Sequence, residues 1–316
     1  MFLAPVSTGA QFAPGTDPFT LSISPQYPAP YGRVIITPVS GQVDITSGVM
    51  TATVGGKEVY RGNAATIEVT LGAPGSTSAI VVRLVSDGRA YTQNLTLTPQ
   101  DVVLVPEPLA STPMLYAGKP LVPLDGSVRI VAMADLRTGA GKRLDPTTLA
   151  YSWVVDGVQI GNASGIGKRA LIVESPLPYR SRTVEVRAAS PDGKLAGAAS
   201  LDLVAAEPTL RIYERDPLLG IRFGRALNST YALRGSESTL YAAAYSFPSA
   251  LGTPILEWFV AGVSAQKGSF ITLRPTGAGA GSASLSVTGS TGGVAGASSN
   301  LSVTFGSGSG SSFFGL

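Results

Sequence analysis

The side chains most able to do chemistry gather between residues 211 and 225. Six polar residues flank the apolar run Pro217–Ile221, namely Tyr213, Glu214, Arg215, Asp216, Arg222 and Arg225. Opposite charges at this density form ion pairs, either within the chain or with a partner. No nucleophile with a neighbouring base is among them. Two alternatives stay open: the segment braces the joint between two domains, or it is a loop that docks a partner.

Catalysis is restricted by the residues that the chain lacks. It has no Cys and no His, which excludes cysteine nucleophiles, imidazole bases, a Ser-His-Asp triad and the commonest metal ligand. Gly161–Arg169 resembles a phosphate loop, but the glycine spacing before Lys168 is wrong and no helix is indicated after it. The carboxylates show no catalytic spacing. We predict a protein that is not an enzyme, with no catalytic residue, no cofactor and no metal.

Charge is low and nearly balanced. The chain has 23 basic and 20 acidic residues, a net charge of +3, and only 14% charged residues, against about 25% in ordinary soluble domains. Because no basic stripe and no cluster of aromatic residues is visible, we predict no nucleic-acid partner. No run of 18 apolar residues occurs, so we predict no transmembrane segment.

The C-terminal end carries no charge at all. After Arg274 no Asp, Glu, Lys or Arg occurs through Leu316. Strands without charges lack the usual protection of their edges. This end is therefore either a sandwich face of small residues followed by a flexible tail, or a surface that packs against another protein or another copy of the chain.

Three segments repeat one another. Trp153 and Trp258 each lie in an apolar run, four residues before a glycine, and Ala52 takes the place of the tryptophan in a fainter copy near the N-terminus. The segments that follow correspond as well, as 79–89 and 183–194 show. A period of about 100 residues indicates tandem domains.

Short alternating segments rich in Val, Thr and Ser predict a nearly all-β chain. Asp87–Gly88, Asp156–Gly157 and Asp192–Gly193 are predicted hairpin turns. Trp153 and Trp258 fall where an immunoglobulin-like sandwich has its core tryptophan. We predict three tandem immunoglobulin-like β-sandwich domains that form an elongated rod, with the sandwiches at residues 18–106, 107–206 and 207–305.

The ends and joints complete this division. Residues 1–17 are an extended arm or the remnant of a signal peptide. Val105–Pro108 and Ala205–Pro208 are predicted to be stiff linkers. Residues 306–316 are a flexible Gly/Ser tail with an apolar tip, in which Phe313, Phe314 and Leu316 are candidate partner contacts. The tip packs back on the last sandwich or is captured by a neighbouring subunit.

The tandem Trp-x-x-x-Gly segments, Trp153–Gly157 and Trp258–Gly262, resemble bacterial surface domains of the PKD and immunoglobulin-like type. Such domains are extracellular spacers or adhesion modules. Ile212–Gly220 and Phe313–Leu316 also resemble segments of uncharacterised exported proteins of ultra-small bacteria, some of them associated with pilus-type surface machinery. The resemblance implies a cell-surface role, with other surface or pilus proteins, or the chain itself, as partners.

We therefore expect a non-enzymatic structural protein that a bacterium exports to its surface, as a spacer, an adhesin or a component of a filament or pilus. Two alternatives remain. One is a phage or virion decoration or tail protein. The other is a carbohydrate-binding accessory module, which would need an exposed aromatic platform, and the candidates are Tyr27, Tyr31, Tyr241 and Tyr245.

Overall fold

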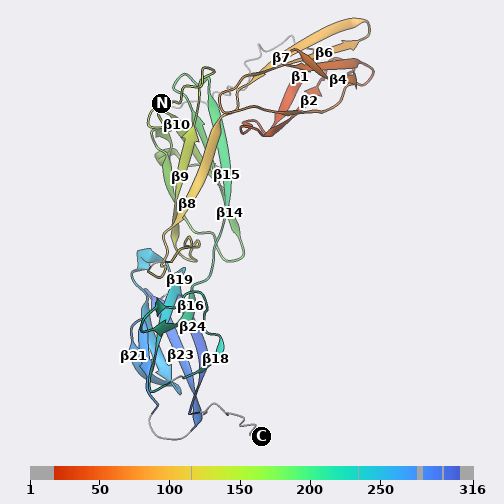
Figure 1. Cartoon of the computed structure of the whole chain (residues 1–316). Helices are drawn as coiled ribbons and strands as arrows, with labels where there is room; N and C mark the ends of the chain where they lie inside the picture. The colour runs from red at the N-terminus through yellow and green to blue at the C-terminus, as the bar shows by residue number, and fades with distance from the viewer. Residues whose placement is uncertain (1–17, 115, 234, 276–279, 294, 307–316) are drawn as a thin grey trace, which may run out of the picture. The chain divides into compact units, whose positions relative to one another are not determined.

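The computed structural model describes residues 18–114, 116–233, 235–275, 280–293 and 295–306. Within these ranges the chain consists of β-strands and two short 3-10 helices, η1 (Gly161–Ala163) and η2 (Ser249–Leu251) (Figure 1). The all-β prediction is confirmed. No helix in the described part of the chain is long and apolar enough to span a membrane. The predicted N-terminal arm and the apolar C-terminal tip lie outside the described residues.

The described chain divides into two compact units. The first extends to Val105 and also contains Ile130–Leu171 and Thr183–Leu201. The second contains Pro106–Arg129, Ile172–Arg182 and the chain from Asp202 onward. The predicted domain boundaries and the number of three sandwiches stay predictions.

The first sandwich consists of two sheets that share one core. One sheet has the strand order β1-β2-β5 and the other β4-β3-β6-β7. The strands are β1 (Thr20–Ser24), β2 (Arg33–Val39), β3 (Val49–Val54), β4 (Lys57–Asn63), β5 (Ile67–Thr70), β6 (Ser78–Ser86) and β7 (Arg89–Leu97). Alternation of buried and exposed residues, as in β2 and β6, turns one face of each strand inward. Phe19, Met50 and Leu84 are among the buried side chains.

Two further sheets follow, with the orders β13-β9-β8 and β11-β10-β14-β15, where β12 also pairs with β10. Their strands are β8 (Asp101–Pro108), β9 (Ser127–Asp135), β10 (Ala150–Val155), β11 (Val158–Gln159), β12 (Gly165–Ile166), β13 (Ala170–Glu174), β14 (Ser181–Ala189) and β15 (Ala196–Val204). The predicted linker Val105–Pro108 is wrong, because these residues belong to β8. An edge strand tolerates Pro106 and Pro108, whose missing N–H groups cost it no essential ladder bond.

The C-terminal sandwich lies wholly in the second unit. Its sheets have the orders β17-β16-β19-β22 and β18-β24-β23-β20-β21. The strands are β16 (Thr209–Asp216), β17 (Gly220–Ile221), β18 (Ser229–Ala232), β19 (Ser238–Tyr245), β20 (Ile255–Val260), β21 (Val263–Lys267), β22 (Phe270–Leu273), β23 (Gly281–Thr291) and β24 (Ala295–Phe305). The charge-free end of the sequence supplies β23 and β24, which pair antiparallel over their full length.

The repeat in the sequence corresponds to a repeated place in the sheets. Ala52 faces Val82, Trp153 faces Val186 and Trp258 faces Val287 across equivalent antiparallel strand pairs. All three are fully buried. Each tryptophan also donates its indole N–H to a backbone carbonyl, Trp153 to Lys168 at 2.8 Å and Trp258 to Gly268 at 3.0 Å. The apolar ring is thus buried without leaving its polar group unpaired.

Two predicted hairpin turns have the backbone that their sequence requires. Asp87 and Asp156 have φ values of 51° and 50°, and each is followed by a glycine with positive φ, as in a two-residue hairpin loop. The third Asp-Gly pair lies in a longer turn between β14 and β15. There Asp192 accepts hydrogen bonds from the Ser190 hydroxyl and the Lys194 N–H.

Candidate functional site

The outer face of the β17-β16-β19-β22 sheet carries a row of aromatic rings. Period-two alternation turns Leu210 and Ile212 into the core, and Tyr213 therefore points the other way. Tyr213 faces Tyr241 across the strands, and Tyr241 faces Phe270. Phe223 packs edge-on against Tyr213 and Tyr241, with ring centroids 5.2 and 6.0 Å away. Tyr213 is only 5% exposed although it lies on the outer face.

The row continues to Tyr245 through a hydrogen bond. The hydroxyl groups of Tyr213 and Tyr245 are 3.0 Å apart. Burial raises the pKa of Tyr245, and the hydrogen bond with Tyr213 raises it further. Burial also raises the pKa of Tyr241. These phenols stay neutral at physiological pH and act as hydrogen-bonding groups with apolar faces.

A segment from earlier in the chain covers this end of the row. Residues 112–114 and 116–121 belong to a loop whose two ends are fixed by backbone hydrogen bonds within the second unit. At one end, Ser111 donates its N–H to the Phe247 carbonyl at 2.8 Å and accepts the Ser246 N–H at 3.1 Å. At the other end, the Ala206 N–H bonds to the Val122 carbonyl at 2.8 Å. The loop is therefore held in place over β16 and β19.

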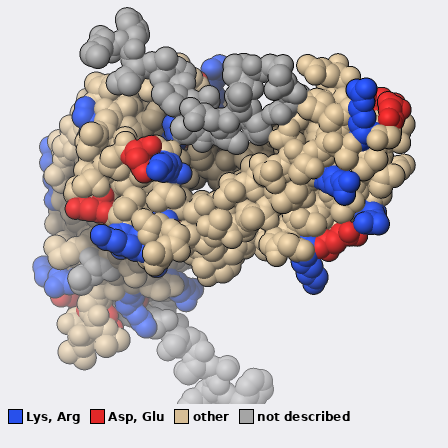
Figure 2. All heavy atoms as spheres, turned by 90° about the horizontal axis from the view of Figure 1, so that it is seen from above, with Lys and Arg blue, Asp and Glu red and all other residues tan. Residues whose placement is uncertain are grey.

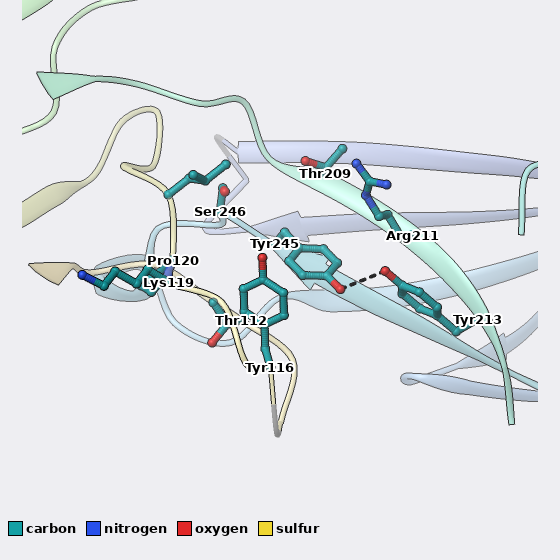
Figure 3. Close-up of a pocket in the computed structure, with 10 residues that line it drawn as sticks. Thr112, Tyr116, Lys119, Pro120, Thr209, Arg211, Tyr213, Tyr245 and Ser246 are labelled. Carbon is teal, nitrogen blue, oxygen red and sulfur yellow. Dashed lines mark hydrogen bonds between the residues drawn. The ribbon is translucent and has the colours of Figure 1, made fainter. Parts of the chain in front are cut away.

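A cavity of about 250 Å³ lies between this loop and the sheet (Figure 3). The ring of Tyr116 meets the ring of Tyr245 edge-on, with centroids 5.4 Å apart and planes at 76°. Gly118 allows this placement, since a Cβ there would lie 2.5 Å from the Tyr116 ring. The remaining lining comes from both the loop and the strands: Thr112, Lys119, Pro120, Leu121, Thr209, Arg211, Tyr213 and Ser246.

The cavity is positively charged. Lys119 and Arg211 line it, and no carboxylate does. In the described part of the chain neither cation forms an ion pair, whereas other arginines do, such as Arg33 with Glu68 at 3.0 Å and Arg274 with Glu237 at 2.7 Å. The lining thus combines two uncompensated cations, several hydroxyl groups and aromatic rings. Such a set of groups suits a small polar ligand with a negative charge.

The six residues predicted between 211 and 225 do not form one site. Tyr213 lines the cavity described above. Arg215 lies over the Phe270 ring, 5.4 Å from its centroid, at a distance typical of cation–π contacts. Asp216 accepts the N–H groups of Leu218 and Leu219 at 2.8 and 3.0 Å, and these hydrogen bonds lower its pKa. Asp216 therefore shapes a turn.

The other three residues line a second cavity of about 640 Å³ beside β18. Glu214 lies 3.9 Å from Arg222 and accepts the Tyr231 hydroxyl at 3.1 Å. Arg225 lines the same cavity. Leu218 and Leu219, in the turn between β16 and β17, are 93% and 76% exposed. The ion pair between Glu214 and Arg222 therefore joins two residues of the C-terminal sandwich.

The tyrosines predicted as an aromatic platform have different surroundings. Tyr245 lines the cavity, and Tyr241 lies in the aromatic row, packed against Phe270 at 4.9 Å. Tyr27 lies under the guanidinium of Arg187 at 5.3 Å. Tyr31 is 70% exposed. Sequence reasoning missed Tyr116, Lys119 and Arg211 as partners of Tyr245, because they come from segments up to about 130 residues away.

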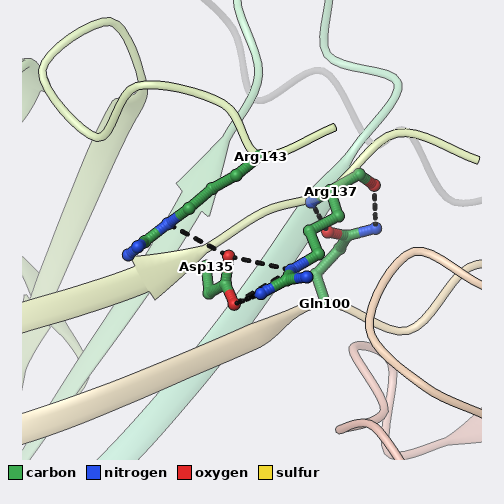
Figure 4. Close-up of polar contacts among 4 residues, drawn as sticks. All are labelled: Gln100, Asp135, Arg137 and Arg143. Atoms are coloured by element: carbon green, nitrogen blue, oxygen red, sulfur yellow. Dashed lines mark hydrogen bonds and ion pairs between the residues drawn. The ribbon is translucent and has the colours of Figure 1, made fainter. Parts of the chain in front are cut away.

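A polar cluster in the first unit is built differently (Figure 4). The side-chain amide of Gln100 accepts the Arg137 N–H at 2.6 Å and donates to the Arg137 carbonyl at 3.1 Å. Arg137 and Arg143 in turn bind Asp135, at 2.8 and 3.1 Å, and the hydrogen bond from Arg137 lowers the pKa of Asp135. Every charged group in this cluster has a partner, so the cluster is a structural clamp.

Charged groups are sparse elsewhere too. Figure 2 shows lysines, arginines and carboxylates as separate small groups, several of them blue beside red, on a largely uncharged face. Among the described residues no group of three or more Asp and Glu side chains is placed to hold a metal ion.

The chain matches no family model, and no curated protein matches it. Solved structures similar to it include the three N-terminal domains of the bacteriophage RB49 Highly Immunogenic Outer Capsid protein (15% identity, 90% of this chain and 98% of that chain, TM-score 0.25). Another is the central fibronectin-III array of RIM-binding protein (11% identity, 92% of this chain and 98% of that chain, TM-score 0.31). A third comprises the fibronectin(III)-like modules of Clostridium thermocellum CbhA (14% identity, 59% of this chain and 94% of that chain, TM-score 0.25). Because each TM-score is below 0.5, no inference about this chain follows from them.

Proposed function

We propose that the chain is a non-enzymatic structural protein that a bacterium exports to its cell surface. There it acts as a spacer, an adhesion module or an assembly component of a filament or pilus. Its partners are other surface proteins or further copies of the chain. The structural observation that supports the spacer part of this proposal is the clamp formed by Gln100, Asp135, Arg137 and Arg143, which ties two parts of the first unit together. Export and the surface role rest on the resemblance in the sequence.

Gln100 connects the segment between β7 and β8 to the loop after β9. It is 3% exposed, and both ends of its amide bond the backbone of Arg137. Gly75 makes a further close approach, since a Cβ there would lie 2.8 Å from the Arg137 Cβ. Buried amides without partners are costly, so these groups hold each other in one arrangement. Such a junction is useful in a protein whose task is to keep its parts at a fixed spacing.

Two other features support the same function. The cores of the first and the C-terminal sandwich consist of apolar side chains packed between two sheets. Large apolar side chains are also exposed on strands, as Ile172 (62%), Ile255 (68%) and Val263 (70%) illustrate. Surfaces of low charge with exposed apolar side chains are suited to association with other proteins.

Electron microscopy tests the proposal. The full chain is compared with a chain that lacks residues 1–17 and 306–316, and filaments that disappear on truncation identify an assembly subunit. Separate particles in both samples identify a spacer or adhesin. Immunogold labelling of the source cells is expected on the outer surface, and labelling confined to the cytoplasm contradicts the proposal.

The clamp is tested separately by Gln100→Ala. The variant leaves the Arg137 N–H and carbonyl without partners, and we expect roughly tenfold faster hydrogen exchange across residues 135–143. Gln266→Ala, at an exposed position of β21, is the matched control. Equal exchange in both variants would remove the argument from the clamp.

A further inference from the structure

We propose that the cavity between residues 112–121 and strands β16 and β19 binds a sugar ring that carries a carboxylate, such as a uronic or sialic acid. The site is independent of the proposed spacer or assembly role, since it uses none of the residues of the Gln100 clamp. Three observations carry the proposal: the aromatic walls, the uncompensated positive charge and the fixed loop.

The aromatic walls come first. Tyr116 is 43% exposed and is placed edge-on against Tyr245. Tyr245 is bonded through its hydroxyl to Tyr213. Tyrosine rings offer large, rigid apolar faces with a hydroxyl at the tip, and a sugar ring has both apolar C–H faces and peripheral hydroxyls. Figure 3 shows the Tyr116 ring, which extends from the loop, next to the Tyr245 ring of β19.

The positive charge of the cavity favours acidic sugars over neutral ones. Arg211 and Lys119 have no acidic partner in the described residues, and the lining contains no Asp or Glu. The Arg211 guanidinium can bind a carboxylate through two parallel hydrogen bonds. Figure 3 shows the Lys119 amine pointing away from Arg211 and the rings, so Lys119 contributes only a point charge at the other side of the cavity. A neutral hexose would leave both cations unmatched. Thr112, Thr209 and Ser246 add hydroxyl groups, each able to donate and accept a hydrogen bond to a sugar hydroxyl.

The size and stability of the cavity narrow the ligand to one ring. Its volume of about 250 Å³ is below the roughly 300–1,000 Å³ typical of sites for drug-sized ligands. The loop above it is fixed by backbone hydrogen bonds at Ser111 and Val122. Because both ends of the loop are already anchored, less conformational entropy is lost when a ligand enters. A single terminal sugar residue, rather than a long chain, fits this space.

The C-terminal sandwich does not need the aromatic rings and cations of the cavity in order to fold. Tyr116 and Lys119 belong to a loop outside the sheets, and Arg211 points away from the C-terminal core, which consists of residues such as Leu210, Ile212 and Trp258. The packing of the sheets gives no reason for these rings and cations to lie together, and we attribute their arrangement to a ligand.

The test uses the full chain and isothermal titration with galacturonic acid, glucuronic acid and N-acetylneuraminic acid. Glucose, acetate and inorganic phosphate are the comparison ligands. We expect saturable binding of at least one acidic sugar and at least tenfold weaker binding of glucose and of acetate. Equal affinity for phosphate or acetate would identify a simple anion site and overturn the proposal, and so would the absence of binding to all three acidic sugars.

Two variants test whether the ligand binds in this cavity. Arg211→Gln is expected to weaken acidic-sugar binding roughly ten- to hundredfold, because a charge-assisted hydrogen bond is lost. Tyr116→Ala should weaken it at least fivefold for acidic and neutral sugars alike. The matched controls are Arg89→Gln and Tyr179→Ala, at exposed positions of the first unit and of the turn after β13. Unchanged affinity in both cavity variants would overturn the proposal.

A further variant keeps every lining side chain but displaces one of them. Gly118→Ala introduces a Cβ where the Tyr116 ring now lies, so the ring must move while Arg211 and Lys119 keep their charges. We expect reduced affinity with an unchanged thermal transition. Full affinity in this variant would show that the position of Tyr116 does not matter, which contradicts the aromatic part of the site.

Discussion

The sheets β1-β2-β5 and β16-β19-β22 occupy corresponding places in two sandwiches, and their outer faces differ. In the first sandwich this face carries small and β-branched side chains such as Ser22 and Thr37, paired across the strands, and the ion pair between Arg33 and Glu68. In the C-terminal sandwich the same face carries an aromatic row and an arginine without an acidic partner. Strand order and alternation are shared, so the fold does not require the aromatic residues.

The inner faces of the two sandwiches differ in which side chains fill the core. Ala52 and Trp258 hold equivalent positions opposite a buried valine. In the first sandwich other large buried side chains, Phe19 and Met50 among them, fill the core. A core can be filled in several ways if its total volume is kept. The difference in the cores is therefore one of packing, whereas the difference in the outer faces is one of function if the proposed ligand site is correct.

The largest expected effect comes from making the two cores alike. Trp258→Ala should destabilise the C-terminal sandwich by about 3–5 kcal/mol, because it creates a cavity and leaves the Gly268 carbonyl without its partner. Hydrogen exchange of peptides from β20 to β24 measures this, and peptides from β1 to β7 serve as an internal control. An effect below about 1 kcal/mol would mean that neighbouring side chains close the cavity, so that an alanine is tolerated here as Ala52 is in the first sandwich.

A smaller effect tests the aromatic row. Tyr245→Phe removes the hydrogen bond to Tyr213 and should cost about 1 kcal/mol at pH 8. The pKa of Tyr245 is raised in the folded chain, chiefly by burial, so the unfolded chain ionises first. Stability is therefore lost as pH rises above about 10, and it should fall less steeply in the variant. Urea unfolding at pH 8 and 10.5 compares the two slopes, and parallel slopes would contradict the assignment.

A third prediction concerns the paired charges of the first unit. Asp135→Asn should cost below about 1 kcal/mol at pH 7. The hydrogen bond from Arg137 lowers the pKa of Asp135 below its ordinary 3.8, so this stabilisation is present above that value and is lost as pH falls through the folded pKa. Thermal unfolding at pH 7 and pH 3 should show a difference between wild type and variant that shrinks at the lower pH. A constant difference would rule out ionisation as its source.

The smallest effect is expected on the outer face of the first sandwich. Arg33 and Glu68 are 76% and 52% exposed in their side chains, and exposed pairs contribute little. Glu68→Gln should change stability by less than about 0.5 kcal/mol in urea unfolding. A larger loss would show that this face, too, depends on a specific contact, and would weaken the contrast with the aromatic face.

The sequence was sufficient for the features that repeat along the chain. Alternation gave the strands, and the spacing of Trp153 and Trp258 marked equivalent strands because each has a fixed place in the sheet register. It was insufficient for Val105–Pro108, since two prolines look like a linker and are also compatible with an edge strand.

The sequence did not predict the cavity, for a different reason. In the sequence, only its residue type marks Tyr245 as a candidate. Tyr116, Lys119 and Arg211 come near it only because Ser111 pairs with the 246–247 backbone, and no local pattern predicts such a long-range contact. Charge density makes residues 211–225 look like one cluster in the sequence, but alternation along β16 sends neighbouring residues to opposite faces.

The loop over the cavity has a consequence for how the protein could diversify. Residues 112–121 are anchored at both ends by main-chain bonds, which any amino acid except proline can donate. The loop contributes no side chain to the core of the first or the C-terminal sandwich, and Pro113 is buried. Its sequence can therefore be exchanged like a cassette, as the variable loops of antibodies are on a constant framework. Libraries randomised at Thr112, Tyr116 and Lys119 would turn this sandwich into a scaffold with a programmable ligand.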